Sequence, residues 1–225
     1  MSDLLHWNRL QLGNIVIPEG QVSHGEYVRM VMNYPCQYAF MQQLFLLSEE
    51  SRNSSSEMWL ESNGEKYYAG TAEFSSRIGS MIRQRGLIAN LTLRENLLLP
   101  FLYHGDKHRL DQATDEAAEV AERLGIASAL DEKAGERTTY THALMSLARC
   151  MLAKPAIIVA QEVHIGMPPD HLQRFRELST QTLAELGSGL LYLTSSADEG
   201  SGLSYARTLT IEADSRSLDS DKENR

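Results

Sequence analysis

The chain has 225 residues and a formal net charge of −9, a length that suits one large α/β domain or two small ones. Its excess of acidic residues is unfavourable for binding a phosphate backbone, so no nucleic-acid partner is expected. No apolar run approaches 18 residues and no signal-peptide pattern opens the chain, so we expect no transmembrane segment of its own.

The first part of the chain is predicted to be rich in β-strands. Residues 14–17 and 26–32 have the pattern of short strands, separated by proline and glycine. Residues 40–47 are apolar enough for two helical turns. Residues 57–60 and 66–68 are predicted to be strands that flank a turn with an Asn-Gly pair.

Helical periodicity begins after about residue 92. Residues 111–124 are predicted to form a helix with Asp111 as its N-cap. Thr141 is the expected cap of a second helix, and Pro169 opens a third. The second helix has apolar side chains with the spacing of one buried face, namely Leu144, Leu147, Ala148, Met151 and Leu152.

Three further strands are expected, at residues 157–160, 190–194 and 208–211. The first two are wholly apolar, which is typical of strands buried on both faces of a parallel sheet. Helices alternating with such strands predict a parallel sheet with right-handed crossovers. Ligands in such sheets sit at the carboxyl ends of the strands, which here follow Met32, Ala160 and Leu193.

Several stretches resemble the ATP-binding subunits of ABC transporters. Residues 77–100, "RIGSMIRQRGLIANLTLRENLLLP", resemble the Q-loop region, and residues 147–162, "LARCMLAKPAIIVAQE", resemble the helix leading into the Walker B strand. Residues 189–196 with 205–212 resemble the switch strand and its successor, and "PEGQVSHGEYVRMVM" resembles the approach to the Walker A loop. The wording of the first stretch is nearest to lipid and lipoprotein exporter subunits.

The resemblance implies a P-loop NTPase-like fold over residues 1–214. Its expected parts are a mainly parallel core sheet, a β-rich N-terminal part and a helical subdomain at about residues 92–150. Residues 215–225 form a polar tail that is expected to be disordered.

The segment at the Walker A position, residues 32–40, lacks what phosphate binding requires. A phosphate loop uses glycines to converge backbone N–H groups on the phosphates and a lysine to neutralise them. This segment contains no glycine, Tyr38 stands at the lysine position, and Ala39 stands at the metal-binding hydroxyl position. We therefore expect weak or no ATP and magnesium binding. Three aromatic side chains are expected to fill the phosphate pocket by packing: Tyr34, Tyr38 and Phe40.

The other motifs of the resemblance are altered as well. The Walker B strand ends in Gln161 and Glu162 instead of Asp-Glu, and Glu162 matches the family's catalytic base. Arg83 stands at the Q-loop glutamine, and Ser195 at the switch histidine. The signature loop falls on residues 137–141, without its glycines. The remaining catalytic candidate is therefore Glu162, and no nucleotide-binding residue is expected.

These changes predict a subunit that has lost ATP hydrolysis and acts structurally or as a regulator. Its expected partners are a membrane permease and a second, active ATPase, at the inner face of the cell membrane. The predicted docking side chains follow the Q-loop: Leu91, Leu93, Leu97, Leu98, Leu99, Phe101 and Tyr103. The alternatives are an ATPase with atypical ligands and residual activity, and a stand-alone interaction scaffold.

Neither the histidines nor the cysteines predict a metal site. His104 and His108 are four residues apart, but no third ligand is evident. Cys36 and Cys150 match no metal or redox spacing, which fits a reduced, cytoplasmic setting.

Overall fold

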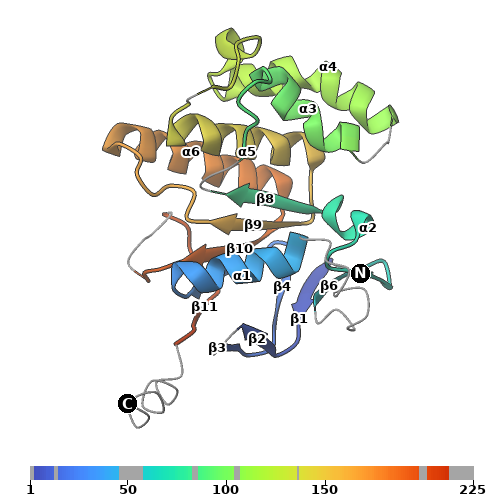
Figure 1. Cartoon of the computed structure of the whole chain (residues 1–225), viewed down its shortest axis with the longest axis vertical. Coiled ribbons are helices and arrows are strands. Elements are labelled where there is room, and N and C mark those ends of the chain that lie inside the picture. The colour runs from blue at the N-terminus through green and yellow to red at the C-terminus, as the bar shows by residue number, and fades with distance from the viewer. Residues whose placement is uncertain are drawn as a thin grey trace, which may run out of the picture.

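A parallel five-stranded sheet forms the centre of the protein (Figure 1). Its strands are β5 (Tyr27–Val31), β8 (Ile78–Ile82), β9 (Ile157–Gln161), β10 (Gly189–Thr194) and β11 (Arg207–Thr210). Their order is β11-β5-β10-β9-β8, and every pair is parallel, as predicted. The computed structural model describes residues 3–12, 15–45, 58–82, 86–103, 107–135, 137–197 and 202–212.

A second, antiparallel sheet lies on one side of the core. It has the order β4-β1-β6-β7, and β2 and β3 form a separate small pair. The bounds are β1 (Leu4–Trp7), β2 (Leu10–Leu12), β3 (Ile15–Ile17), β4 (Gly20–Ser23), β6 (Met58–Ser62) and β7 (Glu65–Tyr68). The predicted β-rich start is confirmed, although β1, β2 and β4 were not among the predicted strands because they are too short for a clear alternation.

Helices cover both faces of the parallel sheet. α1 (Tyr34–Phe45) lies on the side of the antiparallel sheet, whereas α5 and α6 cover the other face with α3 and α4 outside them (Figure 1). The bounds are α2 (Ala72–Ser75), α3 (Leu93–Tyr103), α4 (Lys107–Arg123), α5 (Thr139–Ala153) and α6 (Pro169–Leu186), with a 3-10 turn at η2 (Ala127–Ala129).

The protein has two hydrophobic cores, one on each face of the parallel sheet, and the central strands contribute side chains to both. Ile158 and Ala160 of β9 pack with the helical layer, whereas Ile157 and Val159 pack with α1 and the antiparallel sheet. Successive side chains of a strand point to opposite faces, so a strand between two cores must be apolar throughout. The prediction that β9 and β10 are buried on both faces is confirmed.

Several predicted boundaries were wrong. α4 begins four residues before Asp111, which therefore lies inside the helix and caps nothing. α5 is capped by Thr138, whose hydroxyl accepts the Thr141 N–H at 3.3 Å. Several equivalent polar residues precede each helix, and the sequence pattern does not distinguish between them. The start of α6 at Pro169 is confirmed.

Some predicted features lie outside the described residues. They include Arg83, His104, residues 46–47 of the predicted first helix, and the tail 215–225. In the part of the chain that is described, no helix combines the length and the apolar character needed to cross a bilayer.

Candidate functional site

The carboxyl ends of β5, β9 and β10 meet at one edge of the parallel sheet. The N–H of Met32, just after β5, donates to the carbonyl of Thr194 at 2.9 Å. The N–H of Glu162, just after β9, donates to the carbonyl of Leu193 at 3.1 Å. The three predicted ligand positions are therefore adjacent, as expected for the edge of a parallel sheet where ligands bind.

The connection from β5 to α1 consists of Met32 and Asn33 alone. The Asn33 side chain accepts the N–H of Cys36 at 3.0 Å, and the Asn33 carbonyl accepts the N–H of Gln37 at 3.1 Å. Pro35, in the first turn, has no N–H to donate. Two N–H groups at the start of this helix, those of Cys36 and Gln37, therefore already have acceptors within the chain, and a third is missing at Pro35.

Gln37 reaches from α1 to the carboxyl ends of β5 and β9. Its side chain is fully buried, with 0% of its surface exposed. The amide nitrogen donates to the carbonyl of Met32 at 2.9 Å and to Oε1 of Glu162 at 3.0 Å. If the amide group were rotated by 180°, its oxygen would face the Met32 carbonyl and Oε1 of Glu162, which are both acceptors. These contacts therefore fix the orientation of the amide.

The Glu162 carboxylate is held from two sides. It is 3% exposed, and its backbone has the left-handed φ of 42°. The same Oε1 that accepts from Gln37 also accepts the backbone N–H of Ser195 at 3.0 Å and the Ser195 hydroxyl. We call this set the Gln37–Glu162–Ser195 network. A buried carboxylate is stable only when hydrogen-bonded, and the network supplies those bonds from protein donors.

Two buried amide atoms next to this network lack a hydrogen-bond partner among the described residues. They are Oε1 of Gln37 and Nε2 of Gln161, the last residue of β9. Gln161 is 3% exposed and uncharged, so it offers no carboxylate to a magnesium ion. The position that the family fills with aspartate is thus a buried neutral amide.

The expectation that three aromatic side chains fill the phosphate position was wrong. Tyr34 and Tyr38 are 45% and 47% exposed, because residues four apart share the outer face of α1. Phe40 is fully buried, but it packs edge-on against Trp7, with ring centroids 6.0 Å apart. Ala39 is half-buried. The side chain of α1 that contacts Glu162 at the edge of the sheet is Gln37, which sequence reasoning missed.

One signal could have identified Gln37. With Tyr38 at the lysine position, Gln37 stands at the glycine before it. A glycine there leaves space for a phosphate, whereas glutamine fills the space with an amide that can donate to a carboxylate.

The signature-loop position forms a helix cap. Arg137 donates to the Glu132 carboxylate at 2.9 Å, and Thr138 caps α5. No glycine in this loop lets the backbone approach a ligand. The segment has a structural use that does not involve a nucleotide.

The predicted docking residues divide into buried and exposed groups. Leu93, Leu97 and Phe101 are core residues, exposed by 0%, 0% and 6%, because their i, i+4, i+8 spacing faces α4 and α5. The expectation that these three form a surface was therefore wrong. Leu91, Leu98 and Leu99 are half-buried, and Tyr103 is 79% exposed.

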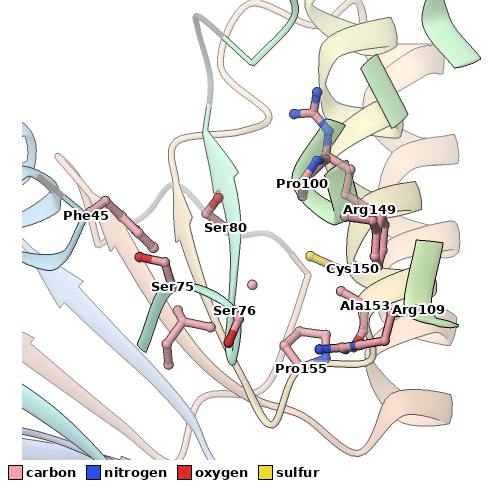
Figure 2. Close-up of a pocket in the computed structure, with 13 residues that line it drawn as sticks. Phe45, Ser75, Ser76, Ser80, Pro100, Arg109, Arg149, Cys150, Ala153 and Pro155 are labelled. Atoms are coloured by element: carbon pink, nitrogen blue, oxygen red, sulfur yellow. The ribbon is translucent and has the colours of Figure 1, made fainter. Parts of the chain in front are cut away.

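A cavity of about 340 Å³ lies between the edge strand β8 and the helical layer. Figure 2 shows Arg109 and Arg149 on the helical side and Phe45 on the opposite side. Arg149 donates to the carbonyl of Asn96 at 2.7 Å and to that of Gly86 at 2.7 Å. These bonds tie the start of α3 to α5.

Known proteins resemble this chain in sequence and in structure. The bacitracin transport ATP-binding protein BcrA of Bacillus licheniformis is 29% identical over 115 residues, which are 51% of this chain and 36% of that protein. The lipoprotein-releasing system ATP-binding protein LolD of Rickettsia bellii is 24% identical over 117 residues, 52% of each. The ADP conformation of MJ1267, an ATP-binding cassette of an ABC transporter, superposes with a TM-score of 0.66 at 17% identity, covering 88% of this chain and 83% of that chain. The chain therefore resembles ABC transporter ATP-binding subunits in fold and, over about half of its length, in sequence.

The structural similarity covers most of the chain, whereas the sequence similarity covers about half of it. CbiO1 of Clostridium perfringens, part of the ABC transporter complex cbiONQ, also has this fold, with a TM-score of 0.65 at 14% identity over 88% of this chain and 80% of that chain. The sequence matches span only about 36–52% of the length of BcrA and LolD. No protein-family model matches the chain. The predicted ABC ATPase fold is confirmed.

Proposed function

We propose that this chain is an ABC-transporter ATP-binding-type subunit that no longer hydrolyses ATP. It serves a structural or regulatory role, docked on a membrane permease or on a paired, active ATPase at the inner face of the cell membrane. The single observation that carries the proposal is the Gln37–Glu162–Ser195 network, which engages the candidate catalytic carboxylate with protein donors.

Nucleotide binding at this site lacks both its charge and its donors. A lysine about 4 Å from a phosphate contributes roughly 4 kcal/mol at an effective dielectric of 20, and Tyr38 supplies none of it. Asn33 accepts the N–H groups of Cys36 and Gln37 in the first helical turn, and Pro35 has none. An energy of that size corresponds to about a thousandfold in affinity.

General base catalysis through Oε1 of Glu162 would also require a change in the network. A base must lie within hydrogen-bond reach of the water that it activates. Oε1 of Glu162 already accepts from Gln37 and from two donors of Ser195. Releasing it would leave buried donors unpaired, which costs about 1–3 kcal/mol for each group.

The second candidate function is residual ATPase activity, and Glu162 is the observation that favours it. This carboxylate directly follows β9 at the carboxyl edge of the sheet, the place of the family's catalytic base. The two candidates differ in whether the purified chain binds ATP.

Binding of a fluorescent ATP analogue with millimolar magnesium decides between the two candidates. We expect no saturable binding and no phosphate release. The control is Glu162→Gln, because any phosphate release that survives this substitution comes from a contaminating ATPase. Saturable binding together with phosphate release that is lost in Glu162→Gln would refute the proposal and support the second candidate.

Docking is tested separately by purification from membranes. A tagged chain recovered with a permease from the membrane fraction supports the transporter role. Recovery as a soluble monomer without any membrane partner would support the alternative of a stand-alone scaffold.

A further inference from the structure

Four side chains form a square on the outer face of the antiparallel sheet. They are His6 of β1, Trp59 and Glu61 of β6, and Lys66 of β7. The strand order places β6 between β1 and β7, and Figure 1 shows β1 beside β6. His6 is directly opposite Trp59, and Lys66 is directly opposite Glu61. We call these four residues the outer-face square.

The pleat of the sheet explains why these side chains share one face. Leu5 precedes His6 and Leu60 follows Trp59, and each leucine is buried in the core with 1% of its surface exposed. Successive side chains of a strand point to opposite faces, so the square faces away from the core. The side chains of His6 and Glu61 are 20% and 37% exposed.

The Trp59 indole is contacted from both neighbouring strands. The imidazole of His6 stacks on it, with ring centroids 4.9 Å apart and an angle of 16° between the planes. The ammonium group of Lys66 lies 4.5 Å from the centroid of the same ring system. A cation is attracted to the electron-rich face of an indole. The square thus holds one cation on its aromatic ring while His6 is neutral.

The Glu61 carboxylate lies close to His6 without a hydrogen bond. Oε2 of Glu61 is 3.7 Å from Nε2 of His6, and this nitrogen is buried with no hydrogen-bond partner among the described residues. A charge-assisted N–H···O bond is about 2.7–2.9 Å long, so a movement of about 1 Å would close the pair. The ion pair gains its full strength only when His6 carries a second ring proton.

Opposing charges act on His6 from two sides. Burial lowers the pKa of His6 from its ordinary value of 6.5, the Glu61 carboxylate raises it, and the Lys66 ammonium group lowers it. On the remaining side, β4 places the neutral Gln21 opposite His6. The net direction is downward, so His6 takes up its proton below pH 6.5. That proton adds a second cation to a square with one carboxylate and one indole.

We propose that the outer-face square is a pH-sensitive switch in which protonated His6 displaces Lys66 from the indole. The imidazolium closes onto Glu61, keeps its contact with Trp59 and repels the ammonium group. Lys66 is exposed and belongs to the edge strand β7, so its long side chain can move into solvent. The outer face then presents a capped indole when His6 is neutral and a released lysine when His6 is charged.

An NMR titration of the full chain between about pH 5 and pH 8 tests the switch. The indole ring current should shift the ε-methylene signal of Lys66 upfield while the ammonium group lies on the ring. We expect this shift to disappear on acidification with the same midpoint as the ring protons of His6. In His6→Gln the Lys66 signal should stay constant over the whole range. Circular dichroism verifies that each variant is folded.

Two substitutions should move the His6 midpoint in opposite directions. Glu61→Gln removes the carboxylate that raises the pKa of His6, so the midpoint should fall. Lys66→Met removes the ammonium group that lowers this pKa, so the midpoint should rise. The matched controls are Glu119→Gln and Lys107→Met, which make the same charge changes at exposed positions of α4 and should leave the midpoint unchanged.

Three results would overturn the inference. The Lys66 signal could keep its upfield shift while His6 takes up its proton, which would mean that the ammonium group stays on the indole. The Lys66 signal could move with pH in His6→Gln as it does in the unaltered chain. The His6 midpoint could stay the same in both Glu61→Gln and Lys66→Met. None of these readouts involves ATP or a partner, so the switch is tested independently of the proposed function.

Discussion

Replacing Gln37 with leucine tests whether the buried network holds the ends of the strands together. Leucine keeps most of the buried volume but removes the donor to Glu162 at 3.0 Å and the donor to the Met32 carbonyl at 2.9 Å. A hydrogen bond to a charged group contributes about 1.5–3 kcal/mol and a neutral one about 0.5–1.5 kcal/mol. We therefore expect Gln37→Leu to lower the free energy of unfolding by about 2–4 kcal/mol.

Urea unfolding followed by tryptophan fluorescence measures this loss. Trp7 is 2% exposed and packs against Phe40 of α1, so its emission reports on the region around the substituted helix. The matched control is Gln43→Leu, which makes the same chemical change at an exposed position of the same helix. We expect the control to change stability by less than about 0.5 kcal/mol.

A double-mutant cycle with Glu162→Gln separates the network from general packing. Residues in one hydrogen-bond network show coupling energies of about 0.5–3 kcal/mol. Additive effects of Gln37→Leu and Glu162→Gln, or equal losses in Gln37→Leu and Gln43→Leu, would refute the assignment of Gln37 as a donor to the buried carboxylate.

Four further outcomes are expected. Asn96→Ala should lower the free energy of unfolding by about 2–4 kcal/mol in urea titrations, because its buried amide accepts from Ile88 N at 2.7 Å and donates to Ile88 O and Thr92 O. The Cys150 thiol should resist alkylation at pH 8 until urea unfolds the chain, because burial raises its pKa from 9.0 to about 12. The unfolded chain loses that proton first, so the stability difference between the unaltered chain and Cys150→Ala should shift against the thiol as pH rises from about 9 to about 12. Tyr38→Lys with Ala39→Ser should not restore binding of the ATP analogue, since the connection from β5 to α1 stays too short for a phosphate loop and Gln37 still fills the site.

The parallel sheet could be predicted because burial on both faces leaves a plain signal in the sequence. β9 and β10 are apolar at nearly every position, and the helix between them, α6, has one buried stripe. The order of these elements along the chain then restricts the topology to a few forms. The start of α1 could not be predicted in this way. Its first turn depends on the Asn33 cap and on Pro35, whose helix-compatible φ is not visible in the hydrophobic pattern.

The sequence predicted which functional groups the candidate site lacks, but not which side chains take their place. Reading Tyr38, Gln161 and Ser195 against the family's motifs identified which groups are missing. What replaces them depends on contacts between residues far apart in the sequence, such as the bond between Gln37 and Glu162. A single sequence gives no information on such pairs. The exposed Tyr38 and the buried Gln37 differ only in the side of the helix on which they lie.

The network explains why a catalytic-type glutamate can remain in a site without a phosphate loop. A buried carboxylate without donors would cost several kcal/mol. Glu162 avoids this because α1 and the end of β10 each supply donors to it. The carboxylate in turn joins β9, β10 and α1 at the edge where a nucleotide would otherwise link the same elements. The hydrogen bonds of Glu162 within the fold thus account for its presence without a catalytic role.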